Sequence, residues 1–349
     1  QAMLRSGDKA TARAAARSLG IAIGEGSDIV TSEDEVRAIA AEMGFPILLK
    51  AAAGGGGRGM RRVDRTEELA GAWASASAEA QQAFGDGRLF VERFVRRARH
   101  VEVQVLADAH GNVIHVGHRD CTLQRRYQKL IEEAPAPNLP GSLGQEILDA
   151  AVRLIGSLDY QGAATCEFLV DEERATYAFL EINARLQVEH PVSEMVTGLD
   201  IVREQLRIAG CEPLSVGQDE VVISGHAIEA RINAESPEAG FSPTPGTITT
   251  WAAPQGTDVR VDTACFPGWT IAPHYDSLLA KVIATGPDRT AAIARLRQAL
   301  RHLRVEGVST TASFAHDILA HPDVVEGRVH TRWLEDVFLD SWTPMEVAA

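Results

Sequence analysis

The stretch KAAAGGGGRGM, residues 50–60, follows the apolar run FPILL and places four consecutive glycines beside Arg58. Glycine tolerates positive φ and lets the backbone approach a ligand closely, so successive N–H groups can point at a phosphate. Lys50 precedes the glycines and no helix start follows them directly, so the pattern is not a Walker-A P-loop. By themselves the glycines fit a phosphate-binding lid and a solvent-exposed turn equally well.

The composition is that of a globular protein. Of 349 residues, 45% are hydrophobic, which is enough for a sizeable core and for about two domains. The net charge of −14 argues against binding along a nucleic-acid backbone, so any basic site must be local. No apolar run reaches the roughly 18 residues that cross a bilayer, and the first residues are not a secretory signal. We expect a soluble, cytoplasmic protein with no nucleic-acid or membrane partner.

The four cysteines are widely spaced and show no CxxC pattern. This spacing fits a reducing compartment in which the thiols are buried as small apolar groups. We assign no catalytic role to Cys121, Cys166, Cys211 and Cys265.

Residues 22–94 are predicted to form a small module. Ser32 and Glu35 have capping-box spacing before VRAIAAEMG, and Gly44 ends that helix. The run FPILLKAA is strand-like, the glycines follow, RRV resumes extended structure, and residues 66–84 form an Ala-rich helix.

The remainder of the chain predicts an α+β fold. RLFVERFV, HVEVQVLAD and VIHVGHRDC alternate apolar and polar residues, which is typical of antiparallel strands. ATCEFLVD and TYAFLEINAR are two further strands, and a last α+β portion begins at Ser224 and ends with a long helix. FSPTPGT is predicted to be a loop. Helices are expected at residues 9–20, 145–158, 198–209 and 288–303.

Two strands carry a candidate metal site. Period-2 alternation places Glu181 and Asn183 on one face, and the short turn between the strands is expected to bring Glu167 opposite them. Converging carboxylates repel one another unless a hard cation lies between them, and Mg²⁺ suits such a set. The alternative is that both glutamates face solvent on a half-exposed sheet.

The motif RLQVEHP follows, with Arg185, Gln187 and Glu189 spaced two apart. If the segment is extended, the three side chains project to one side. Arg185 could then hold a small planar oxyanion while Glu189 takes its proton. A surface salt bridge is the competing interpretation.

Cationic residues gather in HRDCTLQRRYQK, where Gln124 and Lys129 lie near a predicted strand end and could bind an anion. The alternative is that this cationic run forms a solvated face, as such runs usually do. Arg231 lies in an apolar strand and needs an anionic partner if it is buried. His100 and His190 show no metal-binding spacing, so we interpret His190 as structural.

In this order, the motifs resemble the ATP-grasp superfamily, and specifically the biotin carboxylase of biotin-dependent carboxylases such as acyl-CoA carboxylases of fatty acid metabolism. The matching stretches cover nearly the whole chain: GDKATAR, KAAAGGGGRGM, RHVEVQVLAD, RDCTLQRRYQK with EEAPAP, EINARLQVEHPVSEM, GHAIEARINAE and PHYDSLLAKVI. The resemblance implies an α+β ATP-grasp fold with a glycine-loop lid and a biotin carboxylase C-terminal subdomain. The implied boundaries are a linker helix at 1–21, the lid at 22–94, the body at 95–223 and the C-terminal subdomain at 224–349.

The resemblance also implies roles for the matching positions. The ATP-binding residues would be Lys9, Lys50, Gly55, Gly56, Gly57, Gly59, Met60, Glu92, Val95, His100, Gln124 and Leu169. Mg²⁺ or Mn²⁺ would bind Glu167, Glu181 and Asn183, and bicarbonate would bind Lys129, Arg185, Gln187, Val188 and Glu189. Glu189 would be the general base, Arg231 would steady carboxyphosphate and the biotin enolate, and Arg185 and Lys129 would complete the catalytic set.

The implied reaction is ATP- and bicarbonate-dependent carboxylation of biotin through carboxyphosphate. Biotin would be carried by a biotin carboxyl carrier protein or domain, with a carboxyltransferase and a second copy of the chain as further partners. Two features depart from the family: Tyr127 stands where His is frequent, and the N-terminal domain is expected to lie outside this chain. The alternatives are another carboxylating or carbamoylating ATP-grasp ligase, or a nucleotide-binding scaffold without catalysis.

Overall fold

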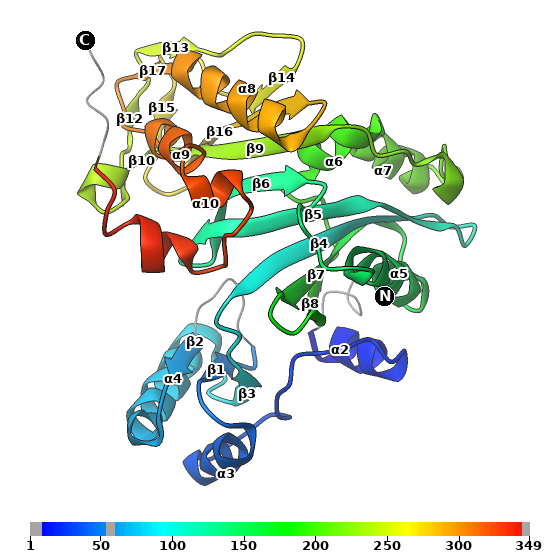
Figure 1. Cartoon of the computed structure of the whole chain (residues 1–349), viewed down its shortest axis with the longest axis vertical. Helices are drawn as coiled ribbons and strands as arrows, with labels where there is room; N and C mark the ends of the chain where they lie inside the picture. Colours follow the sequence, from blue (N-terminus) through cyan, green and yellow to red (C-terminus); the bar gives the residue numbers. More distant parts are fainter. Residues whose placement is uncertain (1–8, 54–59, 344–349) are drawn as a thin grey trace. The chain divides into compact units, whose positions relative to one another are not determined.

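The computed structural model describes residues 9–53 and 60–343, and these divide into two units (Figure 1). The smaller unit consists of the described residues of Ala22–Arg96 together with Arg126–Gln128, and the larger unit contains the remaining described residues. Each unit has an apolar core of its own.

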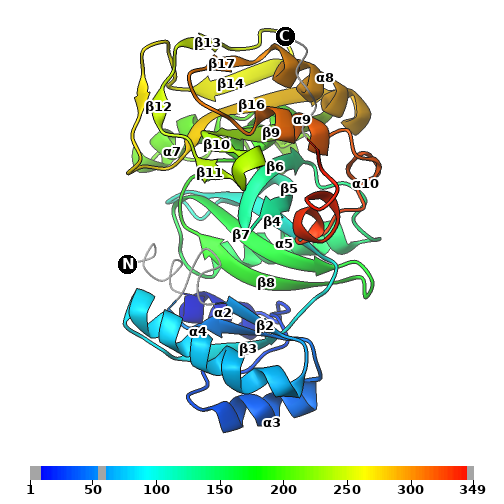
Figure 2. The ribbon, with the colours of Figure 1, turned by 90° about the vertical axis from the view of Figure 1, so that its left-hand side faces the viewer.

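The smaller unit is a three-stranded antiparallel sheet in the order β2-β1-β3. Its strands are β1 (Ile47–Ala51), β2 (Met60–Val63) and β3 (Leu89–Arg93). Its helices are α3 (Glu33–Met43) and α4 (Leu69–Phe84), with the 3₁₀ turn η1 (Thr66–Glu68) leading into α4. Figure 2 shows α4 lying across this sheet, where it packs on β1 and β2.

Strand β1 alternates between the core and the opposite face. Ile47 and Leu49 are fully buried, and two small residues of α4, Ala76 and Ala80, pack in the same cluster with no exposed surface. Because alanine side chains are short, the helix backbone can approach the strands closely. The same alternation turns Lys50 to the other face of the sheet.

Helix α3 begins and ends where the sequence predicts. The Ser32 hydroxyl accepts a hydrogen bond from the Glu35 N–H at 3.3 Å, and Gly44 follows the last turn with a positive φ of 79°. The Glu35 carboxylate accepts from the N–H of Thr31 at 2.8 Å, one residue earlier than a standard capping box requires.

The larger unit contains an eight-stranded sheet in the order β14-β16-β9-β6-β5-β4-β7-β8. Its strands are β4 (Ala98–Ala107), β5 (Val113–Arg125), β6 (Gln128–Ala134), β7 (Gly162–Asp171), β8 (Thr176–Asn183), β9 (His226–Asn233), β14 (Val259–Thr263) and β16 (Leu278–Gly286). Short paired strands are β10 (Glu235–Ser236), β11 (Ser242–Pro243), β12 (Gly246–Thr247), β13 (Thr250–Ala252), β15 (Thr270–Ile271) and β17 (Arg304–Glu306). Strand β4 pairs with β5 on one side and β7 on the other, so residues from distant motifs become neighbours.

The larger unit also contains helices and short helical turns. They are α2 (Lys9–Ser18), α5 (Leu143–Gly156), α6 (His190–Thr197), α7 (Ile201–Ala209), α8 (Arg289–His302), α9 (Ala312–Ile318) and α10 (Pro322–Val325), with the turns η2 (Gln218–Glu220) and η3 (Pro237–Ala239) and the π-helical η4 (Leu334–Phe338). Helix α5 packs on β4 and β5, α6 on β5 and β9, and α8 on β9 and β16 (Figure 1). Leu296 of α8, Val282 of β16 and Trp333 belong to the largest apolar cluster.

Several local expectations are wrong. Helix α6 was not predicted, and helical segments also follow residue 303. Pro191 is compatible with the start of helix α6, because it lies in the first turn, where backbone N–H groups have no partner within the helix. Cys211 is exposed rather than buried, because it lies just past the end of α7. FSPTPGT contains the two short strands β11 and β12 instead of being a plain loop.

Within residues 9–53 and 60–343, every helix is too short or too polar to span a bilayer.

We predict that Ala76→Leu destabilises the smaller unit by about 1–3 kcal/mol, because the added methylenes must displace β1 and β2 side chains. The measurement is urea unfolding followed by the fluorescence of Trp73, which packs against the same core. Ala78→Leu, on the exposed face of the same helix, is the matched control and should change the unfolding free energy by less than about 0.5 kcal/mol. Equal losses in the two variants would contradict this description of α4.

Candidate active site

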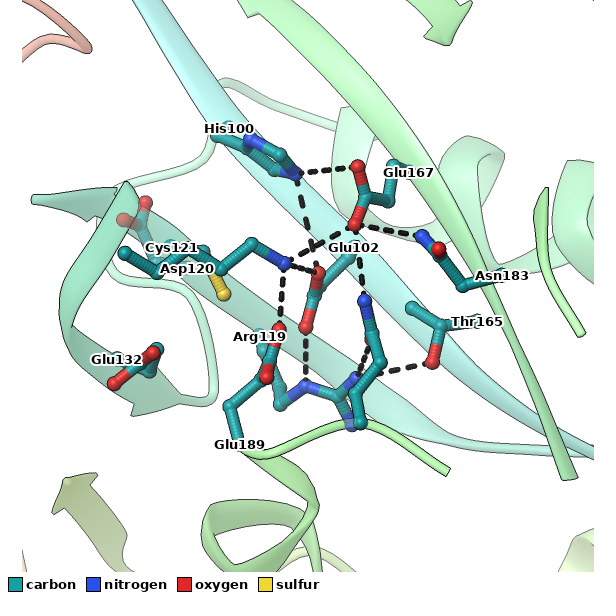
Figure 3. A network of polar contacts seen from close by, with 12 residues as sticks. His100, Glu102, Arg119, Asp120, Cys121, Glu132, Thr165, Glu167, Asn183 and Glu189 are labelled. Atoms are coloured by element: carbon teal, nitrogen blue, oxygen red, sulfur yellow. Dashed lines mark hydrogen bonds and ion pairs between the residues drawn. The ribbon is translucent and has the colours of Figure 1, made fainter. Parts of the chain in front are cut away.

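A cluster of buried charges occupies the larger unit where β4, β5, β6 and β7 meet the start of α6. Figure 3 shows the carboxylates of Glu102, Glu167 and Glu189 turned toward one another. The ammonium of Lys129 lies between them, with Nζ at 2.6 Å from Glu102 Oε2, 3.1 Å from Glu167 Oε1 and 2.5 Å from Glu189 Oε1. Burial alone would lower the pKa of Lys129, but these carboxylates outweigh it and raise that pKa well above its usual value.

Arg119 of β5 joins the segments around this cluster. Its side chain has no exposed surface. It donates to Glu102 Oε1 at 2.6 Å, Gln104 Oε1 at 2.8 Å, Ser193 Oγ at 3.1 Å, Thr165 Oγ1 at 3.1 Å and Gln187 Oε1 at 2.9 Å. A guanidinium has five N–H donors, so Arg119 ties β5 to β4, β7 and the start of α6 with its hydrogen-bonding capacity fully used.

The predicted pairing of acidic strands is confirmed by the register, since Glu167 of β7 lies directly opposite Glu181 of β8. Asn183 donates from Nδ2 to Glu167 Oε1 at 2.9 Å, and His100 Nε2 lies 3.2 Å from Glu167 Oε2. Burial would raise the pKa of Glu167, but His100 and Lys129 lower it, so the group is ionised. Carboxylate and amide oxygens are the donors that Mg²⁺ and Mn²⁺ prefer, so the residues present fit such an ion.

Glu189 connects this cluster to Arg231. Its Oε1 accepts from Lys129, and its Oε2 accepts from Nη2 of Arg231 at 2.9 Å. Arg231 also donates from Nε to Glu132 Oε1 at 2.5 Å. Arg231 is half-buried rather than buried, and its guanidinium meets the anionic partners that the sequence led us to expect.

The expectation that residues 185, 187 and 189 project to one side is wrong for Arg185. Residues 184–189 do not form a strand, because the chain turns there into α6 with Glu189 at its N-cap. Gln187 is buried and donates from Nε2 to Glu167 Oε1 at 3.0 Å, whereas Arg185 is exposed and donates to the carbonyl of Leu186 at 3.2 Å. The carbonyl of Val188 accepts from Nζ of Lys281 at 2.9 Å.

His190 has a local partner, since its Nδ1 lies 2.7 Å from the carbonyl oxygen of Gln187. This contact fits the structural role predicted from the sequence. Gln124 is buried near the end of β5, and its Nε2 donates to the carbonyl of Cys121 at 3.5 Å. Leu169 of β7 lies opposite His100 of β4 in the sheet register.

The smaller unit holds a second ion pair. Nζ of Lys50 lies 2.7 Å from Glu92 Oε2, on neighbouring strands β1 and β3. Met60 lies opposite Lys50 in the pairing of β1 with β2, and Val95 follows β3 with a half-buried side chain. Gly55, Gly56, Gly57 and Gly59 lie outside the described residues, and Lys9 is described only as the first residue of α2.

Two central residues of the cluster, Glu102 and Arg119, were not singled out from the sequence. Burial alone would raise the pKa of Glu102, but Lys129 and Arg119 lower it to about 2. The available signal was a charged residue inside each of the alternating runs HVEVQV and HVGHRDC. Period-2 alternation puts Glu102 and Gln104 on one face, but it does not say whether that face meets water or other charges.

Comparisons with known proteins identify the family of this chain. Residues 8–216 match the family described as carbamoyl-phosphate synthase L chain, ATP binding domain, and residues 229–336 match the biotin carboxylase C-terminal domain. A biotin carboxylase from a Nostoc strain is 45% identical over 338 residues, covering 97% of this chain and 75% of its own length. One from Pseudomonas aeruginosa is 48% identical over 331 residues, covering 94% and 73%. The chain belongs to the biotin carboxylase family.

Solved structures of biotin carboxylases share the fold. The enzyme from Campylobacter jejuni, a β-γ-ATP complex, superposes with a TM-score of 0.92 at 41% identity and covers 96% of this chain and 74% of its own. The biotin carboxylase domain dimer of 2-oxoglutarate carboxylase from Hydrogenobacter thermophilus, solved with MgADP, ADP and bicarbonate, has a TM-score of 0.92 at 42% identity. It covers 97% of this chain and 75% of its own. The chain is thus an ATP-grasp ligase whose family joins carbon to nitrogen by carboxylating biotin with ATP, Mg²⁺ and bicarbonate.

We predict that Arg119→Met lowers the free energy of unfolding by about 3–5 kcal/mol, because it leaves Glu102 buried without one of its two cations. Urea unfolding monitored by circular dichroism measures this loss. Arg203→Met, at an exposed position of α7, removes the same charge and should stay within about 0.5 kcal/mol of the unaltered chain. An Arg119→Met variant as stable as the control would show that the hydrogen bonds and ion pair of Arg119 contribute nothing to the free energy of unfolding.

Proposed function

We propose that this biotin carboxylase uses Glu189 as the general base that takes the proton of bicarbonate. The observation that carries the proposal is the position of Glu189, whose two oxygens accept from Lys129 and Arg231 at 2.5 and 2.9 Å. An anion bound beside these two cations would lie next to the carboxylate that must accept its proton. Loss of that proton makes bicarbonate a better nucleophile toward the terminal phosphate of ATP.

Arg231 is suited to hold an anionic ligand because its side chain is 16% exposed, compared with 3% for Glu189. Nε and Nη2 make its two hydrogen bonds to carboxylates, and a guanidinium has five N–H donors in total. We assign it the stabilisation of carboxyphosphate and of the biotin enolate. Lys129, Gln187, Val188 and the exposed Arg185 complete the proposed bicarbonate site, with Arg185 free to reorient toward the bound anion.

We assign Mg²⁺ or Mn²⁺ to Glu167, Glu181 and Asn183. When bound, the ion neutralises phosphate charge as the phosphoryl group is transferred. The proposed ATP contacts of the larger unit are His100, Gln124, Leu169 and Lys9. Those of the smaller unit are Lys50, Met60, Glu92 and Val95, and the proposed contacts also include Gly55, Gly56, Gly57 and Gly59, which lie outside the described residues. Carboxyphosphate must be kept from water, so the glycine-rich stretch is proposed to act as a lid over the phosphates.

The proposed layout keeps the sequence-based boundaries: a linker helix at 1–21, a lid at 22–94, a body at 95–223 and a C-terminal subdomain at 224–349. The known relatives occur as separate subunits and as domains of larger carboxylases, such as pyruvate carboxylase 1 of Caenorhabditis elegans, which is 45% identical. We therefore propose a biotin carboxyl carrier protein or domain, a carboxyltransferase and a second copy of the chain as partners. We also propose a cytoplasmic location. Relatives are found in other compartments as well: one from Arabidopsis thaliana, 44% identical, is a chloroplastic biotin carboxylase.

The test of the function is ATP hydrolysis that requires bicarbonate and is stimulated by free biotin. Bicarbonate-dependent but biotin-insensitive hydrolysis would indicate a different ATP-grasp ligase. No bicarbonate-dependent hydrolysis would indicate a nucleotide-binding scaffold.

We predict that Glu189→Gln lowers biotin-stimulated turnover by about 10²–10⁴-fold, because the amide cannot accept the proton. ATP affinity, measured by equilibrium binding, should stay within about twofold, since the change leaves the proposed nucleotide contacts in place. Glu173→Gln, at an exposed position after β7, is the control for the charge change and should leave both quantities unaltered. Carboxylation at the normal rate by Glu189→Gln would falsify the assignment of the base.

We predict that Glu181→Gln raises the Mg²⁺ concentration needed for half-maximal ATP binding by about tenfold, which corresponds to about 1.4 kcal/mol. The physical reason is that the amide offers the cation one neutral oxygen in place of a charged carboxylate. A metal titration at fixed ATP concentration provides the measurement, again with Glu173→Gln as control. An unchanged titration curve counts against the metal site on β7 and β8.

A further inference from the structure

Two buried glutamates face each other on neighbouring strands, and one of them is hydrogen-bonded to Arg231. Glu132 of β6 and Glu229 of β9 are direct partners in the antiparallel register, and neither has any exposed surface. Side chains at directly opposed positions lie on the same face, with Cβ atoms about 4.5–5.5 Å apart. Oε2 of Glu132 and both carboxyl oxygens of Glu229 are buried without a hydrogen-bond partner. Buried polar atoms are rarely left so, and each such case calls for a physical explanation.

The neighbouring cations are engaged with other groups. The charged groups that act on the pair are Lys129 on β6, Arg231 on β9, Lys281 on β16 and Glu189 at the start of α6. Nζ of Lys281 lies 3.2 Å from Oδ2 of Asp262 and donates to the carbonyl of Val188. The ammonium of Lys129 forms ion pairs with three other carboxylates. Arg231 donates to Oε1 of Glu132, and Oε2 of the same carboxylate has no hydrogen-bond partner.

Two ionised carboxylates in this position would repel each other in a region that water does not reach. Burial, with repulsion from Glu132, raises the pKa of Glu229 well above its usual value, and burial raises the pKa of Glu132 to about 7. A carboxyl group whose pKa is raised keeps its proton below that pKa and loses it as the pH rises through it. The pair therefore holds at least one proton at neutral pH.

We propose that Glu229 is protonated and donates a hydrogen bond to Oε2 of Glu132, and that this carboxylic acid–carboxylate pair positions Arg231 for its anionic ligand. The hydrogen bond supplies partners for two of the three unpaired oxygens. It also removes one negative charge that would otherwise compete for Arg231, so that the guanidinium retains attraction for a further anion. Glu229 is thus a positioning residue that acts through Glu132. The part of the inference that concerns ligand binding rests on the proposed function, whereas the shared proton does not.

Infrared spectroscopy of the chain near pH 7 tests the shared proton directly. A protonated carboxyl gives a carbonyl band separate from that of carboxylates, and we expect this band in the unaltered chain and its loss in Glu229→Gln. The carbonyl band can be assigned to this pair. Among the carboxyl groups of residues 9–53 and 60–343 whose pKa is shifted, only those of Glu132 and Glu229 have a raised pKa. Glu173→Gln should keep the band. Absence of the band from the unaltered chain, or its survival in Glu229→Gln, overturns the proposal.

Steady-state kinetics tests the positioning of Arg231. Glu229→Met keeps a side chain of similar length but cannot donate to Glu132, so we expect the KM for bicarbonate to rise about tenfold, the effect of losing one charge-assisted hydrogen bond. The KM for ATP should stay within about twofold in the same variant. Glu229→Gln retains a donor and should restore the KM for bicarbonate to within about twofold of the unaltered chain.

Equal behaviour of Glu229→Met and Glu229→Gln, or a parallel rise in the KM for ATP, would show that Glu229 has only a packing role. The two experiments also separate this inference from the proposed function. The infrared band requires no turnover, so a chain that showed the band but no biotin-stimulated hydrolysis would refute the proposed function and leave the shared proton standing. If Glu229→Met does not fold, the infrared comparison of the unaltered chain with Glu229→Gln still decides the matter.

Discussion

The site depends on a continuous row of alternating charges, each buried or half-buried: Arg119, Glu102, Lys129, Glu189 and Arg231. Each neighbour pair in this row is within hydrogen-bond distance, between 2.5 and 2.9 Å. Removing so many charges from water costs a large amount of free energy, which is offset only if each charge meets its counterion and its remaining hydrogen-bonding positions are used. The row can therefore exist only when β5, β4, β6, β9 and the start of α6 are all in place, which couples the geometry of the site to the order of the strands.

The same row explains why chemically identical side chains have different protonation states. Glu102 lies between two cations and is held ionised, with its pKa lowered to about 2. Glu132 shares the cation that donates to it, Arg231, with Glu189 and faces Glu229, and burial raises its pKa to about 7. The difference lies in the balance of neighbouring charges, since both side chains are fully buried. One sheet can thus supply an ionised counterion on β4 and a proton-holding pair on β6 and β9, with only β5 between them.

The interpretation of the site from the sequence succeeded where a local rule governs the outcome. A short turn joins β7 and β8, so the facing of Glu167 and Glu181 followed from strand pairing. It failed where the backbone changed conformation, because Arg185 was assigned a direction by assuming extended structure that the start of α6 interrupts. Glu102 and Arg119 were not identified from the sequence. Alternation along a strand predicts on which face of the sheet a side chain lies, but not whether water or other residues cover that face.

Most elements and all of the family motifs could be recognised from the amino-acid sequence without coordinates. Apolar periodicity, the Ser32 cap and Gly44 set helix and strand positions through interactions within a few residues, and the motif order indicated the ATP-grasp family. Which charges meet became clear only from the folded arrangement of the strands. Lys129 reaches carboxylates at positions 102, 167 and 189 because the strand order β6-β5-β4-β7 and the start of α6 bring these segments together. Charge pairing acts through space at distances of a few ångströms, and the separation of residues along the chain does not encode it.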